Sequence, residues 1–146
     1  MIISKTPYRI SFFGGGTDYP QWHFKEEGKV LSTTIDKYLY ISCRFLPSFF
    51  DHNYRIVWSK IENVARINQI EHKAIREILK YLKIKQGLEI HYDGDLPSRS
   101  GMGSSSSFVV GLLKALYRIK NYNPTNKEIA KKSIFIEQKI LNETVG

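Results

Sequence analysis

Cysteine is almost absent from the sequence: Cys43 is the single one among 146 residues. One thiol excludes an internal disulfide framework and suits a reducing compartment. It also excludes a cysteine-rich zinc site, and the histidines are too far apart in sequence to suggest another kind of zinc centre. They are His23, His52, His72 and His91.

Long hydrophobic runs are absent too. The longest, around residues 108–117, is interrupted by Lys114 and is too short to cross a bilayer. Near the N-terminus, Lys5, Pro7 and Arg9 interrupt the apolar residues, so no signal peptide is recognisable. We therefore expect a cytoplasmic protein that does not bind a membrane.

Acidic residues are few compared with basic ones, 14 against 22, which gives a net charge of +8. This charge admits nucleic acid, anionic lipid or phosphorylated small molecules as partners. In residues 66–85, however, most Lys and Arg fall between the apolar positions of an expected helix, as on a solvated face. The charge alone therefore selects no partner.

The remaining composition is ordinary for one globular domain, with 42% hydrophobic and 25% charged residues. Residues 1–146 contain no internal repeat and no long linker, and they suffice for a hydrophobic core. The first half favours β-strands at residues 8–13, 35–45 and 54–59. Alternation places six side chains on one side of the strand 35–45: Ile35, Lys37, Leu39, Ile41, Cys43 and Phe45.

The second half is mainly helical. Apolar residues at steps of three and four predict an amphipathic helix over 67–83 and another that begins near Ser105. Between these helices, residues 88–95 alternate as in a strand. A capping box of Thr125 and Glu128 predicts a final helix. Strands and helices are grouped rather than alternating, which favours an α+β domain.

The stretch LPSRSGMGSSSSF, residues 96–108, connects the last predicted strand to a helix. A glycine-rich turn at a helix N-terminus offers unpaired backbone N–H groups and the positive end of the helix dipole. Gly101 and Gly103 allow the backbone to approach phosphate closely, and the serines at 104–107 offer hydroxyls to phosphate or Mg²⁺. A flexible Gly/Ser linker fits less well, because the strongly patterned helix needs a fixed N-terminus. We interpret the stretch as a phosphate-binding loop.

The loop is not a Walker A motif, because no lysine follows Gly103. It resembles the P-x-x-x-G-L-G-S-S loop of the GHMP kinases, with Met102 in place of the usual leucine. A second stretch, PYRISFFGGGTDY at residues 7–19, is similar to the P-x-R-x-x-x-x-G-x-x-T-D-Y motif of the sugar-binding members. Two motifs in this order make a specific match, and the resemblance covers essentially the whole chain.

The resemblance implies the fold of the GHMP kinase N-terminal domain, a mixed or antiparallel sheet packed with helices that is similar to a domain of a ribosomal protein. It implies ATP and Mg²⁺ as cofactors, and transfer of the γ-phosphoryl group to a hydroxyl of a sugar or sugar phosphate. The ATP phosphates are then expected at Pro97, Ser100, Gly101, Met102, Gly103, Ser104, Ser105 and Ser106.

The N-terminal motif is expected to hold the acceptor. Arg9 matches an arginine near the transferring phosphoryl group, where charge stabilisation is needed, and is the catalytic candidate. Asp18 matches an acid that accepts hydrogen bonds from sugar hydroxyls. Without the family match, Arg9 would be a solvent-facing strand residue and Asp18 an ordinary turn residue. The substrate-binding candidates are Gly14, Gly15, Gly16, Thr17 and Asp18.

Glu137 is a candidate from the sequence pattern itself. It shares a partly apolar helical stripe with Ala130, Ile134 and Leu141, where a carboxylate needs a partner or a metal. A rim residue paired with nearby Lys or Arg is an equally good interpretation of this pattern. In the family a glutamate of this helix ligates Mg²⁺, so the resemblance implies Ser105 and Glu137 as the metal ligands.

Within the family, the chain is most similar to heptose 7-phosphate kinases that feed bacterial surface-polysaccharide synthesis. The expected substrate is therefore D-glycero-D-manno-heptose 7-phosphate. The galactokinase branch has Glu-His where this chain has Gly15 and Gly16, which argues against galactose and leaves room for a bulkier sugar. A basic surface also suits an anionic substrate.

The family's general base is an aspartate that would follow shortly after Gly146, and Asp51, Asp93 and Asp95 do not match it. The third glycine-rich motif and the C-terminal domain are absent as well. We therefore expect residues 1–146 to be the ATP-binding N-terminal domain of a longer kinase, with little turnover on its own.

Two other functions stay open. The charge and nine tyrosines permit a non-catalytic nucleic-acid-binding module, but aromatic side chains within strands suit a core better than a stacking platform. The chain is also compatible with a regulatory or partner-binding fragment. If a further domain normally covers part of the apolar surface, that surface would be exposed in residues 1–146, and self-association to a homo-oligomer is a further possibility.

Overall fold

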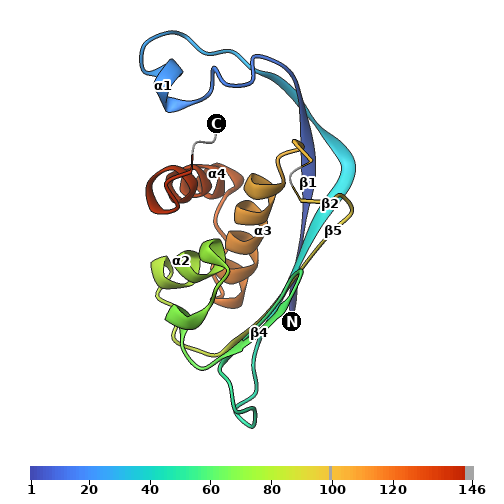
Figure 1. Cartoon of the computed structure of the whole chain (residues 1–146), viewed down its shortest axis with the longest axis vertical. Coiled ribbons are helices and arrows are strands. Elements are labelled where there is room, and N and C mark those ends of the chain that lie inside the picture. Colours follow the sequence, from blue (N-terminus) through green and yellow to red (C-terminus); the bar gives the residue numbers. More distant parts are fainter. Residues whose placement is uncertain (99, 144–146) are drawn as a thin grey trace.

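The computed structural model describes residues 1–98 and 100–143, and consists of one five-stranded sheet with helices on one face (Figure 1). The strands are β1 (Ile2–Phe13), β2 (Leu31–Phe45), β3 (Tyr54–Val57), β4 (Ile61–Val64) and β5 (Leu88–Gly94). The sheet order is β1-β2-β5-β3-β4, and all neighbours are antiparallel except β3 and β5. The predicted α+β class with a mixed sheet is therefore confirmed.

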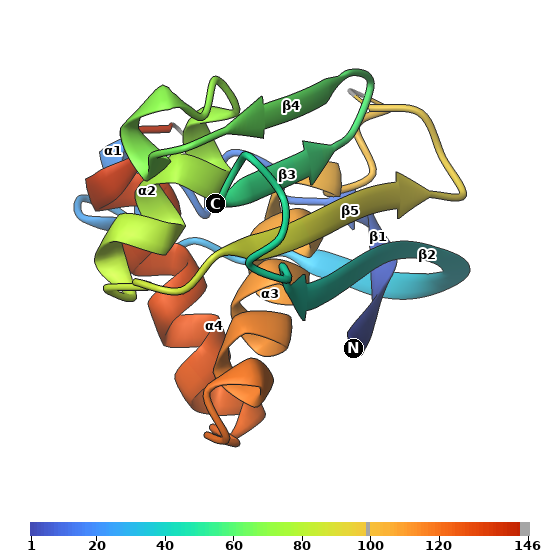
Figure 2. The ribbon, with the colours of Figure 1, turned by 90° about the horizontal axis from the view of Figure 1, so that it is seen from below.

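The helices are α1 (Pro20–His23), α2 (Lys73–Tyr81), α3 (Ser104–Ile119) and α4 (Asn126–Phe135). Helices α2, α3 and α4 lie on the same side of the sheet, and α3 packs directly on β1 and β2 (Figures 1 and 2). The core fills the space between these two layers. Within the described residues, every helix is too short or too polar to cross a membrane.

The inner side of β2 follows the predicted alternation only in part. Leu39, Ile41 and Cys43 are buried against the helices, as expected. Lys37 is exposed, because the register of β1 and β2 shifts between Pro7 and Arg9 and interrupts the alternation there. Phe45 is also exposed, since it ends the strand. The pattern therefore holds where α3 covers the sheet.

Burial makes the Cys43 thiol unreactive. The side chain is 1% exposed, and desolvation raises the pKa of the thiol to about 12. Because the thiolate is the reactive form, we expect the folded protein at pH 8 to resist Ellman's reagent. The same protein in guanidinium chloride should react fully. Fast labelling of the folded protein would contradict the burial of this thiol.

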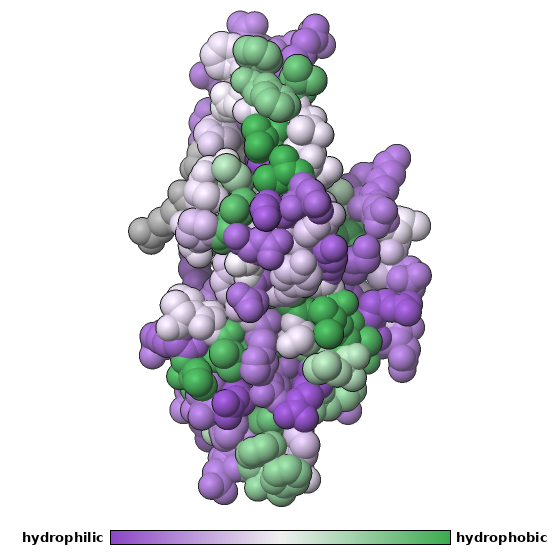
Figure 3. All heavy atoms as spheres, turned by 90° about the vertical axis from the view of Figure 1, so that its right-hand side faces the viewer, coloured by the Kyte–Doolittle hydropathy of each residue, from purple (hydrophilic) through white to green (hydrophobic). Residues whose placement is uncertain are grey.

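The described residues place no helix on the opposite face of the sheet, and Figure 3 shows hydrophilic residues there with separate hydrophobic areas. Glu89 of β5 is nevertheless buried on this face, because Arg44, Arg55 and His91 surround it. Burial alone would raise the pKa of Glu89, but hydrogen bonds from His91 and Arg44 lower it. This ion-pair network covers the middle of the open face.

The helix predicted over 67–83 begins later than its pattern indicates. A 3-10 turn covers Ile67–Gln69, Ile70 is extended, and α2 begins only at Lys73. The reason lies in β4, where the buried Glu62 carboxylate accepts hydrogen bonds from the backbone N–H groups of Glu71 and His72. These bonds hold the residues before α2 out of helical geometry. Strand β4 and helix α1 have no counterpart in the sequence-based prediction.

The C-terminal helix begins as predicted and ends differently. Thr125 and Glu128 form the capping box at its start. A π-helical turn then covers Ile136–Ile140, where Leu141 N–H donates to the Ile136 carbonyl. This turn changes which side chains of the C-terminal helix face the core. The predicted stripe was wrong at Ala130 and Ile134, which are exposed, whereas Glu137 and Leu141 are buried.

Candidate functional site

The site is built around the loop that connects β5 to α3. Gly101 and Gly103 both have left-handed backbone angles, φ 75° and φ 72°, which suit glycine and turn the chain into the helix. Gly103 is the N-cap of α3. Among the described residues, the backbone N–H groups of Ser104 and Ser105 have no hydrogen-bond partner, as expected for a first helical turn. The loop therefore presents free amides at the positive end of α3.

The loop is fixed by bonds to β1. Arg9 N–H donates to the Met102 carbonyl at 3.1 Å, and the Ser107 hydroxyl donates to the Pro7 carbonyl at 3.0 Å. Further along α3, Phe108, Val109 and Leu112 are buried in the core. A flexible linker would have neither the bonds nor the anchor. Arg99 belongs to this motif but lies outside the described residues.

A hollow of about 260 Å³ lies where the loop meets the N-terminal motif. The guanidinium of Arg9 borders it, and its Nη1 donates to the Ser11 hydroxyl at 2.5 Å. A Cβ atom at Gly103 would lie 3.0 Å from Arg9 Cγ, so the loop and Arg9 are in close contact. The lining residues are Arg9, Ser11, Gly15, Gly16, Asp18, Tyr19, Gly101, Gly103, Ser105 and Ser106.

The N-terminal motif forms a tight turn after β1. Asp18 Oδ1 accepts a hydrogen bond from Gly16 N–H at 3.0 Å, and both residues line the hollow. Thr17 Oγ1 donates to the carbonyls of Gly14 and Lys29, and no Cβ fits at Gly14, where it would lie 1.8 Å from the Lys29 carbonyl oxygen. Gly14 and Thr17 therefore hold the start of the segment between β1 and β2 against its end at Lys29.

Glu137 lies in the π-helical turn and interacts with Ser106 and Arg9, which line this hollow. It is 2% exposed, and its Oε1 has no hydrogen-bond partner among the described residues. Burial raises the pKa of its carboxyl; the Ser106 hydroxyl lowers it, Glu143 raises it, and Arg9 lowers it. A buried carboxylate oxygen without a partner, close to a serine, suits a hard cation such as Mg²⁺. The residues present thus fit the expected metal.

A second hollow of about 260 Å³ lies on the other side of the α3 N-terminus. Its walls are aromatic: His72 stacks on Phe108 with ring centroids 5.1 Å apart, and Trp58 meets His72 edge-on at 5.0 Å. Burial lowers the pKa of His72, which favours a neutral ring. Ser105 borders this hollow as well as the first one. The helix N-terminus therefore separates a polar hollow from an aromatic one.

The fold brings most of the predicted site residues together. Those that line the polar hollow are Arg9, Gly15, Gly16, Asp18, Gly101, Gly103, Ser105 and Ser106. Ser104 lines the aromatic hollow, and Ser100 has a buried hydroxyl without a partner among the described residues. Pro97, Met102, Gly14 and Thr17 line neither hollow.

Two lining residues, Ser11 and Tyr19, were missing from the sequence-based set. Ser11 follows Arg9 by two positions on the same strand, so period-2 alternation places both side chains on one face and is a signal that could have found it. Tyr19 directly follows Asp18 in the quoted motif. The aromatic hollow had no signal in sequence, because its walls come from separate elements. Across the described residues, no three His, Cys, Asp or Glu side chains gather as a metal-binding group.

Comparison with known proteins gives a family match. The family described as GHMP kinases N terminal domain matches residues 68–146. A D-glycero-alpha-D-manno-heptose 7-phosphate kinase of Campylobacter jejuni is 32% identical over 99% of this chain and 45% of its own length. The chain thus spans about half the length, or less, of the curated relatives that it matches.

Solved structures share the fold. A D-glycero-D-manno-heptose 1-phosphate kinase from Bacteroides thetaiotaomicron has a TM-score of 0.83 at 24% identity, over 100% of this chain and 51% of the other. Streptococcus pneumoniae phosphomevalonate kinase, in complex with phosphomevalonate and AMPPNP, has a TM-score of 0.69 at 20% identity, over 95% and 44%. At these identities the likeness establishes the fold alone.

Proposed function

The chain belongs to the GHMP kinase family, and we propose that it supplies the nucleotide-binding part of a kinase that transfers the γ-phosphoryl group of ATP to a sugar or sugar phosphate. One observation carries this proposal. The free amides at the start of α3, the guanidinium of Arg9 and the carboxylate of Asp18 border the same hollow. An anion and a polyhydroxyl compound would find their binding groups side by side there.

The two hollows beside the α3 N-terminus suit the two ends of ATP. The amides and hydroxyls of the loop would hold the phosphates, because a helix N-terminus favours negative charge. The aromatic hollow with Trp58, His72 and Phe108 would take the flat, apolar base. Ser105, which borders both hollows, would lie between base and transferred phosphoryl group.

Ser105 and Glu137 are the residues that would hold Mg²⁺. When bound, this ion would neutralise charge on the phosphate oxygens. Arg9 would offset the charge that develops on the γ-phosphoryl group, and its bond to Ser11 would keep the guanidinium in place. In the transfer a bond forms between the acceptor oxygen and phosphorus, while the bond from phosphorus to the bridging oxygen of ADP breaks. The proton of the acceptor hydroxyl would pass to a general base, which the family resemblance places after Gly146. Asp18 would orient the acceptor by accepting hydrogen bonds from its hydroxyls.

We propose D-glycero-D-manno-heptose 7-phosphate as the acceptor. The name of the Campylobacter relative supports this choice. So does the space at Gly15, where nothing lies within 4 Å of an added Cβ atom. Two small residues at 15 and 16 leave the hollow open toward a long sugar.

Calorimetry on the whole protein tests the proposal. MgATP and the heptose 7-phosphate should both bind, and galactose should bind more weakly. Ser105→Ala should weaken MgATP by about tenfold, the loss of roughly 1.4 kcal/mol, and leave sugar binding unchanged. Asp18→Ala should weaken sugar binding and leave MgATP binding unchanged. MgATP binding that does not respond to Ser105→Ala would refute the assigned cradle, and absence of any sugar binding would refute the acceptor class.

A further inference from the structure

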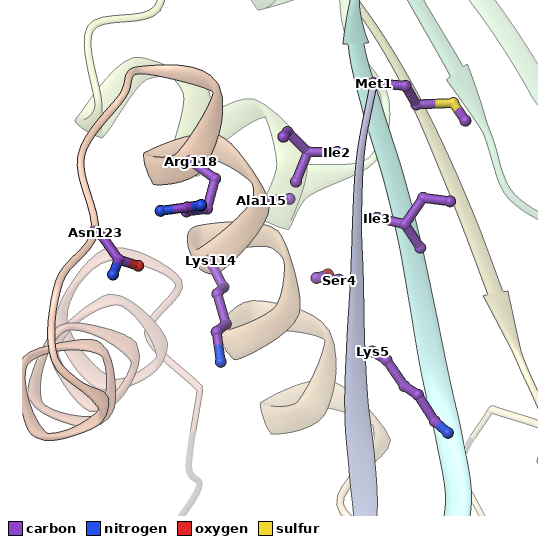
Figure 4. Close-up of a pocket in the computed structure, with 9 residues that line it drawn as sticks. All are labelled: Met1, Ile2, Ile3, Ser4, Lys5, Lys114, Ala115, Arg118 and Asn123. Carbon is purple, nitrogen blue, oxygen red and sulfur yellow. The ribbon is translucent and has the colours of Figure 1, made fainter.

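A further hollow, of about 450 Å³, lies away from the candidate site (Figure 4). It is formed by the first residues of β1, among them Ile3 and Lys5, and by Lys114 and Arg118 of α3. None of its lining residues borders the polar or the aromatic hollow. The proposed function makes no use of it.

The hollow lies along an unpaired part of a sheet edge. Strand β1 lies at one end of the sheet order and, within the described residues, pairs with β2 alone. Its later part is covered, since the Pro7 carbonyl and Arg9 N–H bond to α3 and the phosphate loop. Backbone groups of alternate residues face the same edge of a strand, so the N–H and C=O groups of Ile3 and Lys5 face this side as well. Within the described residues, they have no partner there.

The side chains around this edge carry positive charge without compensation. Lys114 and Arg118 are exposed, lie one turn apart on α3, and make no ion pair in the part of the chain that the structure describes. Among the described residues, the partner of Lys5 is the face of the Tyr38 ring, 3.7 Å from its centroid. No acidic residue lines the hollow. A ligand here would need to be anionic.

The two faces of β1 differ in character. Ile2 and Ser4 point toward α3, and Ser4 Oγ donates to the Gly111 carbonyl. Met1 and Ile3 point to the opposite face, where they are 81% and 60% exposed (Figure 4). A strand added at this edge would therefore meet Lys114 and Arg118 on its α3 side, and the apolar Ile3 beside the basic Lys5 on its other side.

We propose that this edge binds an extended acidic segment of a partner protein, which adds a sixth strand beside residues 2–5 of β1. Alternate residues of that segment would be acidic and face α3, and the others would be apolar and pack beside Ile3. The spacing agrees: Lys114 and Arg118 are about 6 Å apart along the helix, and same-face residues of a strand are about 6.8 Å apart. Strand addition of this kind takes its affinity from main-chain bonds and its specificity from side chains.

Other occupants fit less well. A second copy of this chain would bring its own Lys5, Lys114 and Arg118 against the same residues, and like charges would repel. A nucleic acid would leave the backbone groups of Ile3 and Lys5 without partners, and no aromatic side chain lines the hollow for base stacking. The unpaired main chain therefore favours a polypeptide.

A fluorescein-labelled heptapeptide of alternating glutamate and valine is the probe, used with the whole protein. We expect saturable anisotropy, and slower hydrogen exchange at Ile3 and Lys5 by at least about tenfold when the peptide is bound. A peptide with lysine for glutamate should not bind. A peptide of equal charge with proline as its central residue should bind at least about tenfold more weakly, since it lacks a main-chain donor.

Charge-reversal variants distinguish binding at this edge from non-specific attraction between the acidic peptide and the basic protein. Lys114→Glu with Arg118→Glu should weaken the peptide by at least about tenfold. The matched control, Lys127→Glu with Lys131→Glu on the exposed side of α4, should change the affinity by less than about twofold. Equal binding by both double variants, or by the proline peptide, would overturn the proposal. So would protection of the Ile3 and Lys5 amides before peptide is added, because the edge would already be covered by the protein itself or a second copy.

Discussion

Gly103→Ala is expected to weaken MgATP binding by at least about tenfold and to leave the fold intact. A side chain at φ 72° costs about 1–2 kcal/mol, and about 1.4 kcal/mol already corresponds to tenfold in affinity. The added Cβ would also lie 3.0 Å from Arg9 Cγ, so relief of strain would displace the loop or Arg9. Calorimetry measures the affinity, and circular dichroism confirms that the variant is folded.

Two other glycines serve as controls for this result. Gly101 has φ 75° but open space around a new Cβ, so Gly101→Ala introduces backbone strain without the contact. Gly15 has neither, and Gly15→Ala should leave MgATP binding unchanged. The loss of MgATP affinity should therefore be largest for Gly103→Ala, smaller for Gly101→Ala and smallest for Gly15→Ala. Unchanged MgATP affinity in Gly103→Ala would refute the role of this bend.

Glu137→Gln is expected to stabilise the metal-free protein at pH 7 and to remove its response to Mg²⁺. The pKa of Glu137 is raised, mainly by burial, so the folded state binds a proton more readily than the unfolded state. Its contribution to stability is full at low pH, falls as pH rises from the ordinary glutamate pKa to the raised one, and stays low above that window. An unpaired buried group costs roughly 1–3 kcal/mol, and glutamine would avoid much of this loss.

Thermal unfolding at several pH values, with and without MgATP, checks this prediction. Wild-type protein should lose stability across that pH window and regain it with MgATP, whereas Glu137→Gln should show neither change. Glu77→Gln is the matched control, because Arg76 and Lys80 lower the pKa of Glu77. The stability that the ionised Glu77 contributes to wild-type protein should be small and should disappear as pH falls through its lowered pKa. An MgATP response of Glu137→Gln equal to that of wild type would exclude Glu137 as a metal ligand.

Features that depend on nearby residues were predictable from the sequence. The capping box of Thr125 and Glu128 and the glycine turn into α3 are local, since each needs only a few neighbouring residues. The start of α2 was not predictable from its own pattern, because Glu62 from β4 determines it across the fold. The π-helical turn at Ile136–Ile140 likewise has no signature in the spacing of apolar residues.

The candidate site divides in a similar way. The loop proposed to bind phosphate followed from residue types at a predicted helix start. Arg9 and Asp18 were found through the resemblance, because a strand arginine or a turn aspartate has no distinctive pattern of its own. The wall formed by Trp58, His72 and Phe108 depends on three segments that meet only in the folded chain. Long-range packing of this kind is not encoded in local periodicity.

The hydrogen bond from Arg9 N–H to the Met102 carbonyl joins two segments to which the proposed function assigns different ligands. A nucleotide that tightens the bend around Met102 would restrain the strand that carries Arg9, and through it the turn at Asp18. Thermodynamic linkage then requires the reverse effect of equal size, so that the acceptor improves nucleotide affinity as much as the nucleotide improves acceptor affinity. The order in which the two compounds arrive would change the path and leave the total free energy of the ternary complex the same.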